Sequence, residues 1–311
     1  MRRTAGGRID AGVLLLLTPV MWGATFPGAK LALRYLPPFA FMAWTRILGA
    51  LSILVLIPLI RRTAGGGEGR TGRDRRVIVP GLVLGALIFV AYFLQTEGLA
   101  RTTATNAGFI TGLYVVFTPL LASVAFGHRV PRAAWLAVTI SVAGLMLLSV
   151  RDFGQFRVHA GDLLVLAGAV VWAGHVVGVG HFAPRYSVWK LSLAQMATTA
   201  GFHIVAAIPG GLRLHAAASV RVWPLLLLTG AVGSGIAYTL QIMGQRGMTA
   251  TRAVVILAGE ALFAAGFSAL WIGERLQVHQ WGGAVLVLAA MAYSEVAARR
   301  SSHLLEPASA P

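Results

Sequence analysis

The stretch AYFLQTEGLARTTATNA at residues 91–107 returns 146 residues later as AYTLQIMGQRGMTATRA at residues 237–253. The two stretches share apolar residues, but also a Tyr and a Gln three positions apart, a glycine and a Thr-Ala-Thr turn. Unrelated apolar helices match by chance at Leu, Val and Ala, and seldom at Tyr and Gln in register. The chain therefore contains an internal repeat, and the repeat determines the fold that the sequence predicts.

The repeat extends in both directions from this stretch. Downstream, residues 127–129 match residues 273–275 at the same offset. Upstream, Trp22 matches Trp172 at an offset of 150. The difference between the two offsets fits a longer loop in the first half, because residues 61–76 are rich in Gly and Arg.

The composition predicts that the repeat is embedded in a membrane. Of 311 residues, 57% are hydrophobic and 12% are charged, whereas an ordinary soluble domain carries about 25% charged residues. A membrane-spanning helix needs about 20 mostly apolar residues. Ten segments meet or approach that length: 11–30, 38–60, 77–99, 103–126, 132–150, 161–180, 188–209, 222–244, 251–272 and 278–297. The predicted fold class is all-α, a polytopic membrane protein of ten transmembrane helices.

Each repeat holds five spans, and five is odd, so the two repeats enter the membrane in opposite directions. We expect the first repeat at residues 11–150 and the second at 151–297, between a cytoplasmic N-terminal segment, 1–10, and a cytoplasmic tail, 298–311. With the N-terminus inside, 17 of the 26 Lys and Arg residues lie in inside segments and 8 in outside segments. The positive-inside rule therefore places both termini in the cytoplasm. Inverted repeats are a recurrent design of secondary transporters, with the binding site between the repeats.

Several motifs carry a resemblance to a known family. They are Trp22-Gly23, Arg46, the segment from Gln95 to Asn106, Gly259-Glu260, and residues 273–275. Together they resemble an EamA-type member of the drug/metabolite transporter superfamily. The resemblance implies ten helices with both termini in the cytoplasm, and a location in the bacterial inner (plasma) membrane. It also implies export of small metabolites such as amino acids, or of amphipathic drugs.

Polar and aromatic residues inside the expected spans are the candidate substrate-binding residues, because polar groups in hydrocarbon usually face the protein interior. Residues three apart share a helix face, which groups them in pairs. These pairs are Trp22 and Thr25, Tyr92 and Gln95, Trp172 and His175, and Tyr238 and Gln241. Matching faces from the two repeats predict one central cavity. The alternative is that the rings pack in the bundle core and that the amides join neighbouring helices.

Two charged residues lie within expected spans and form a separate prediction. Arg46 lies in the second span and Glu260 in the ninth, at depths that their long side chains could bridge. Buried charges usually pair, so the two are expected to form either a permanent structural pair or a switch that breaks during transport. Glu260 is also the candidate proton carrier, because it is the only acidic residue near the middle of a span.

The sequence disfavours other kinds of function. The chain has no cysteine, its eight His residues show no metal-ligand spacing, and Gly28-Ala29-Lys30 is not a phosphate-binding loop. We therefore expect no cofactor, no metal and no nucleic-acid partner. The expected partners are a small-molecule substrate, the lipid bilayer and, as a candidate coupling ion, the proton. The alternative from another class is an integral-membrane enzyme acting on lipid or prenyl substrates, which usually clusters Asp, His or Arg at one membrane face.

Overall fold

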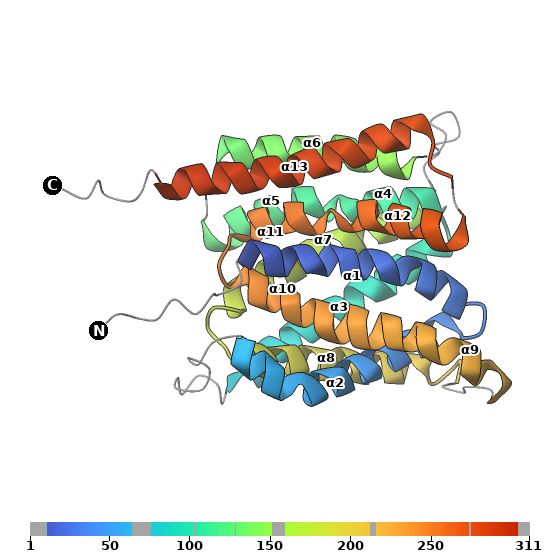
Figure 1. Cartoon of the computed structure of the whole chain (residues 1–311). Coiled ribbons are helices and arrows are strands. Elements are labelled where there is room, and N and C mark those ends of the chain that lie inside the picture. The colour runs from blue at the N-terminus through green and yellow to red at the C-terminus, as the bar shows by residue number, and fades with distance from the viewer. Residues whose placement is uncertain are drawn as a thin grey trace.

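The computed structural model describes residues 11–63, 76–102, 104–127, 129–150, 159–211, 216–273 and 275–303. These residues form a bundle of helices, and no strand occurs among them (Figure 1). Helices are expected here, because every backbone polar group in hydrocarbon needs a partner within its own segment. The segment 1–10, most of the basic loop 61–76 and the end of the predicted tail lie outside the described residues.

Five spans make up the first half of the bundle. The fourth of them is divided into two helices. The helices are α1 (Ala11–Ala32), α2 (Pro38–Thr63), α3 (Ile78–Leu99), α4 (Ala104–Gly112), α5 (Tyr114–Phe126) and α6 (Arg132–Ser149).

Five further spans make up the second half. Here the ninth span is divided, and the eighth contains a π-helical segment, η3. The elements are α7 (Ala160–Phe182), α8 (Val188–Ala207), α9 (Ala216–Leu226), η3 (Leu227–Ile236), α10 (Ala237–Gln245), α11 (Ala250–Leu257), α12 (Glu260–Ile272) and α13 (Val278–His303). The all-helical fold of ten spans that the sequence predicts is confirmed.

Nine of the spans are long and apolar enough to cross a membrane by length and composition, among the described residues. The remaining span is α8, which has 20 residues but a more polar composition. Its buried residues include Gln195 and His203, which have no exposed surface. Because α8 packs against both α2 and α3, these polar groups point into the bundle rather than toward lipid.

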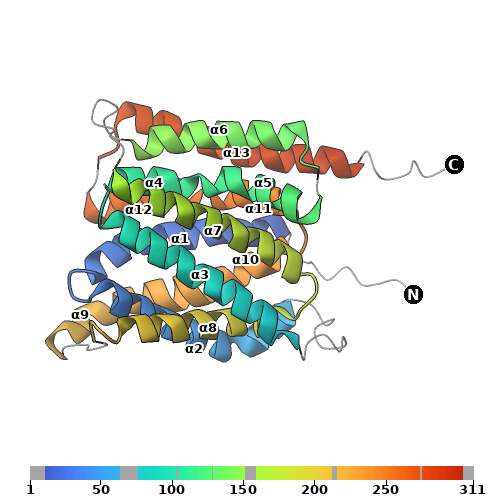
Figure 2. The ribbon, with the colours of Figure 1, turned by 180° about the vertical axis from the view of Figure 1, so that it is seen from behind.

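The packing of the helices is nearly unchanged when the two halves are exchanged. Helix α3 packs along α7, and its counterpart α10 packs along α1. Helix α1 packs along α12, and its counterpart α7 packs along α4 and α5. The pairs α2–α8 and α6–α13 each join two equivalent helices. Helix α1 begins at the end of the bundle where α13 ends (Figure 1), while α7 begins at the opposite end (Figure 2). The two halves are thus inverted repeats.

Equivalent glycines allow equivalent helices to touch. A Cβ atom added at Gly98 in α3 would lie 2.9 Å from the carbonyl oxygen of Gly161 in α7. A Cβ atom added at Gly244 in α10 would lie 3.0 Å from the carbonyl oxygen of Ala11 in α1. The two contacts are related by the offsets 146 and 150 that were read from the sequence. Both glycines therefore serve close helix approach.

The divided spans break at equivalent positions. Helix α4 ends at Gly112 and α5 begins at Tyr114, while α11 ends at Leu257 and α12 begins at Glu260. Tyr114 and Glu260 are therefore repeat counterparts, each in the first turn of a half-helix. Helix α5 packs against α11, so a half-helix of one divided span contacts a half-helix of the other.

The glycines at the ends of α5 and α12 explain part of the repeat. Gly127 has φ 65° and Gly273 has φ 68°, both in the left-handed region. Each donates its backbone N–H to a carbonyl near the end of its helix, that of Ser123 or of Ser268. A residue without a Cβ atom adopts this conformation at little cost, which is the physical reason for the match between residues 127 and 273.

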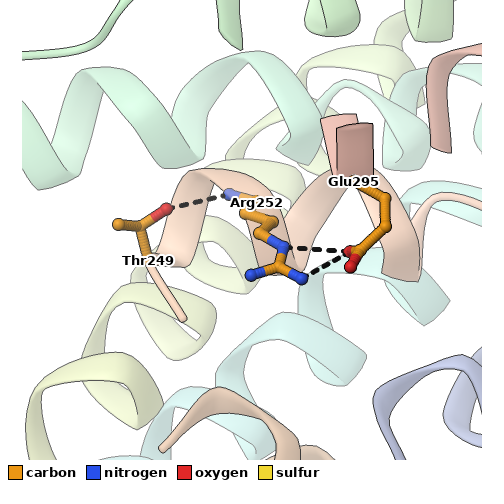
Figure 3. A network of polar contacts seen from close by, with 3 residues as sticks. All are labelled: Thr249, Arg252 and Glu295. Atoms are coloured by element: carbon orange, nitrogen blue, oxygen red, sulfur yellow. Dashed lines mark hydrogen bonds and ion pairs between the residues drawn. The ribbon is translucent and has the colours of Figure 1, made fainter. Parts of the chain in front are cut away.

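A polar network fixes the start of α11 (Figure 3). The hydroxyl of Thr249 accepts a hydrogen bond from the backbone N–H of Arg252, 3.3 Å away. The guanidinium of Arg252 donates from Nε, at 3.1 Å, and from Nη2, at 2.5 Å, to one carboxylate oxygen of Glu295 in α13. Thr249 thus caps α11, and the ion pair ties α11 to α13.

Candidate functional site

Four aromatic residues from four helices meet in the interior of the bundle. The ring of Trp22 in α1 packs on that of Tyr238 in α10, with 5.0 Å between centroids. The ring of Trp172 in α7 packs on that of Tyr92 in α3, with 4.9 Å between centroids. Each Trp contacts the Tyr of the other repeat, so exchanging the halves converts one pair into the other. The structure brings together the four rings that the sequence singles out.

Arg46 of α2 joins the two aromatic pairs. Its guanidinium carbon lies 4.4 Å from the centroid of the Tyr92 ring and 6.0 Å from that of Tyr238. One terminal nitrogen donates a hydrogen bond to the hydroxyl of Ser234, and the other lies 3.9 Å from the sulfur of Met42. The side chain of Arg46 is buried, with 4% of its surface exposed. We call Trp22, Tyr92, Trp172, Tyr238 and Arg46 the central cluster.

The partners of Trp22 and Thr25 are in the π-helical segment and in α1 itself. The indole N–H of Trp22 donates to the carbonyl oxygen of Gly233, 3.0 Å away. The hydroxyl of Thr25 donates to the carbonyl oxygen of Trp22 at 2.7 Å. A Cβ atom at Gly233 would lie 2.4 Å from the Thr25 methyl group. Thr25 therefore packs against the π-helical segment.

His175 lies at the edge of the central cluster. Its ring is 5.8 Å from that of Tyr238 and 6.1 Å from that of Trp172, centroid to centroid. Its Nε2 atom lies 3.3 Å from the side-chain oxygen of Gln195. Gln195 of α8 thus contacts Nε2 of His175, while Nδ1 has no hydrogen-bond partner among the described residues.

The two glutamines that share helix faces with the tyrosines point elsewhere. The amide nitrogen of Gln95 donates to the Thr111 hydroxyl in α4, 3.1 Å away. The amide nitrogen of Gln241 donates at 3.0 Å to Gln245, whose own amide nitrogen donates at 2.9 Å to the carbonyl oxygen of Val176 in α7. Gln95 thus joins α3 to α4, while Gln241 reaches α7 only through Gln245, and both contacts favour the alternative in which the amides serve helix packing.

Glu260 lies apart from Arg46. Within the described part of the chain, the carboxyl group of Glu260 forms no ion pair with Arg46, whose polar contacts are those given above. The pair predicted between Arg46 and Glu260 is therefore not formed in this conformation. The depth estimated from the sequence gives no information on the lateral position of either side chain in the bundle.

Some residues of the site were not singled out from the sequence. Ser234 accepts from Arg46, Gln195 holds His175, and the ring of His203 lies 6.3 Å from that of Tyr92. The signal for Ser234 was the Gly-Ser-Gly run at 233–235 in an otherwise apolar span. For Gln195 and His203 it was the polarity of the seventh span.

The π-helical segment η3 positions Gly233 and Ser234. Gly230 leaves room for α2, since a Cβ atom there would lie 3.0 Å from the carbonyl oxygen of Thr45. The hydroxyl of Ser52 in α2 contacts the carbonyl oxygen of Ala231 at 3.3 Å. π-Helical turns are rare within α-helices, and where they occur they are frequently at functional sites. No group of three His, Cys, Asp or Glu side chains that could hold a metal ion occurs among the described residues.

Comparison with a family model decides the relationship of this chain to known proteins. Residues 11–150 and 159–294 match the model of the EamA-like transporter family. The chain belongs to the EamA-like transporter family. The resemblance seen in the sequence motifs is confirmed, and each matched block holds five of the ten spans of this EamA-like transporter.

Relatives of this EamA-like transporter carry transporter names. An uncharacterized transporter of Archaeoglobus fulgidus is 29% identical over 91% of this chain and 85% of its own length. A pseudopaline exporter of Pseudomonas aeruginosa is 27% identical over 72% and 75%. A probable amino-acid metabolite efflux pump of Salmonella typhimurium is 25% identical over 82% and 95%. One solved crystal structure shares the fold, with a TM-score of 0.76, 19% identity and coverage of 93% of this chain and 98% of that chain.

Proposed function

We propose that this EamA-like transporter exports small metabolites such as amino acids, or amphipathic drugs, by alternating access between its inverted repeats. The observation that carries the proposal is the exchanged pairing of Trp22 with Tyr238 and of Trp172 with Tyr92. A site built equally by two inverted halves has two nearly equivalent packings, each open to one side of the membrane.

The chemistry of the central cluster supports the substrate class. Aromatic rings offer apolar contact area, and tyrosine adds a hydroxyl group. Such a lining suits aromatic and other apolar amino acids as well as amphipathic drugs. The relatives named as a pseudopaline exporter and as a probable amino-acid metabolite efflux pump support export as the direction. We propose the bacterial inner membrane as the location, with both termini in the cytoplasm.

The enzyme alternative is less well supported. The acidic residues discussed above are distributed rather than gathered, since Glu260 begins α12 while Glu295 pairs with Arg252 at the start of α11. The names of the family and of the relatives indicate transport. Flux of solute across a sealed bilayer separates the two functions, because an enzyme would not produce it.

Glu260 is our candidate for energy coupling. It is partly buried in the first turn of α12, just after the break in the ninth span. No ion pair among the described residues holds this carboxyl group in its ionised form, so it can gain and lose a proton during a transport cycle. Its counterpart Tyr114 carries no ionisable group of similar acidity, so coupling would act through one half only.

The test uses purified protein in liposomes loaded with labelled phenylalanine or with an amphipathic dye. We expect protein-dependent flux, and accumulation against the solute gradient when a pH gradient is imposed. Glu260→Gln should equilibrate the solute without accumulating it, while Glu295→Gln, at the α11–α13 contact, serves as the matched control and should still accumulate it. Wild-type flux that never exceeds equilibration would make the protein a facilitator, and no flux above protein-free liposomes would refute the transport proposal.

A further inference from the structure

Arg46 is a buried cation whose contacts in the described part of the chain are all with neutral groups. They are the hydroxyl of Ser234, the sulfur of Met42 and the rings of Tyr92 and Tyr238. Its Nε atom has no hydrogen-bond partner among the described residues. A charged side chain is costly at this depth unless it is paired. The site thus presents one uncompensated positive charge and one unused donor.

The fold does not require a charge at this position. The buried residues of α2 and α8 correspond at an offset of 150, as shown by Phe41 with Leu191 and Thr45 with Gln195. At this offset the counterpart of Arg46 is Met196, whose side chain is fully buried. An apolar residue therefore suffices to pack this turn of the helix in the other repeat. Packing alone does not account for the arginine.

The surroundings of Arg46 limit what the missing partner can be. Guanidinium groups bind carboxylates through two parallel N–H donors. The Nη1 atom is engaged by Ser234 and Nη2 contacts only the weakly accepting sulfur of Met42, so Nε, the donor without a partner, and the adjacent Nη2 form the edge of the fork that a carboxylate would use. The rings of Tyr92, 4.4 Å from the guanidinium carbon, and of Tyr238, 6.0 Å away, stand beside this charge. A ligand that meets the charge therefore meets aromatic surface at the same time.

We infer that Arg46 binds the carboxylate of the transported solute, while the rings of the central cluster hold its apolar or aromatic body. This inference rests on the proposed transport function and narrows its substrate class to carboxylates that carry an apolar group. The bound anion supplies the counter-charge that the described residues do not, so the occupied site no longer holds an unpaired charge. An amine or a neutral amide with the same body lacks that contribution.

The test measures binding to the purified full-length protein by the rise in its melting temperature. Four probes share one aromatic body, namely L-phenylalanine, 3-phenylpropionate, phenethylamine and L-phenylalaninamide. We expect the two carboxylates to bind at least about tenfold more tightly than the amine and the amide, which corresponds to about 1.4 kcal/mol. Comparing L-phenylalanine with 3-phenylpropionate then shows whether the natural substrate is an amino acid or another carboxylic acid. Equal binding of all four probes by the wild-type protein would overturn the inference without need of any variant.

Variants connect this preference to Arg46. Arg46→Gln should abolish the difference between carboxylates and amide, whereas Arg46→Lys should keep the preference at reduced affinity, because a lysine retains the charge but not the fork. Arg246→Gln is the matched control. Arg246 lies in the same span as Tyr238 but donates at 2.9 Å to the carbonyl oxygens of Ala183 and Tyr186 at the end of the bundle. An unchanged carboxylate preference in Arg46→Gln would refute the role of Arg46.

The same probes distinguish failure of this inference from failure of the proposed function. If liposomes show flux of the amine or the amide but no carboxylate preference, the export proposal stands and the role of Arg46 falls. If the protein binds carboxylates selectively through Arg46 but moves no solute, the anion site stands and the transport proposal falls.

Discussion

The third and eighth spans carry the same motif, yet their backbones differ. Helix α3 is a regular α-helix of 22 residues, whereas the eighth span passes through ten residues of π-helix before α10 begins. At the offset of 146, Gly230, Gly233 and Gly235 of the eighth span correspond to bulky apolar residues of α3, which are Leu84, Leu87 and Phe89. Helix α2 approaches the backbone closely at Gly230 and Gly235, and α1 does so at Gly233.

The two tyrosines of the shared motif differ accordingly. Tyr238 has 1% of its surface exposed and contacts Trp22 and His175, whereas Tyr92 is only partly buried. The repeat sets which residues reach the centre, while the packing around each residue differs between the two halves. We therefore assign Tyr238 mainly to the support of the site and Tyr92 mainly to its accessible surface.

The largest expected effect concerns the opposite directions in which the two halves cross the membrane. A reporter fused after residue 68 should report as cytoplasmic, and one fused near residue 155 as periplasmic, because the basic residues favour the side of residue 68. The measurement is paired activity of a phosphatase reporter, active outside, and a fluorescent reporter, active inside. The reverse pattern at both positions would contradict the assigned orientation.

Replacing each tyrosine by alanine should separate support from surface. Tyr238→Ala removes a fully enclosed ring, so we expect a loss of roughly 3–5 kcal/mol in the free energy of unfolding and little folded protein. Tyr92→Ala should leave the protein folded and reduce solute flux severely, because the lost ring is partly accessible and lies over Arg46. Fluorescence-detected size exclusion and liposome flux measure the two effects. Wild-type flux in Tyr92→Ala would show that Tyr92 has a packing role and does not line the substrate site.

The smallest effect should be equal in the two halves. Gly98→Ala and Gly244→Ala each place a Cβ atom within 3.0 Å of backbone or side-chain atoms of the facing helix. We expect each to lower the free energy of unfolding by about 1–3 kcal/mol, the usual cost of overpacking, seen as similar drops in melting temperature. Gly201→Ala is the control, since a Cβ atom there meets nothing within 4 Å. A large difference between the two variants would show that the crossings of α3 with α7 and of α10 with α1 are not equivalent.

Much of the fold follows from the sequence by itself. The apolar segments predict the ten helices, and the match of residues 91–107 with 237–253 predicts their arrangement as two repeats, because spans of given length and order can cross a bilayer in few ways. The match of Gly127 with Gly273 extended the repeat, and the structure gives its reason, since both glycines end a helix in the left-handed conformation that glycine adopts at little cost. The four aromatic residues of the site were also identified in this way.

The partners of these residues were decided by tertiary structure alone. Helical periodicity shows that Tyr92 and Gln95 share a face, but a face a few residues wide contacts more than one neighbouring helix. Thus Tyr92 reaches Trp172 while Gln95 reaches Thr111. Depth in the membrane suggested Glu260 as the partner of Arg46, whereas lateral packing brings Ser234 to it instead. The sequence determines the depth of a residue in the membrane and the helix face on which it lies, because both depend on local helix geometry. Which neighbouring side chain the residue contacts depends on how the ten helices pack together.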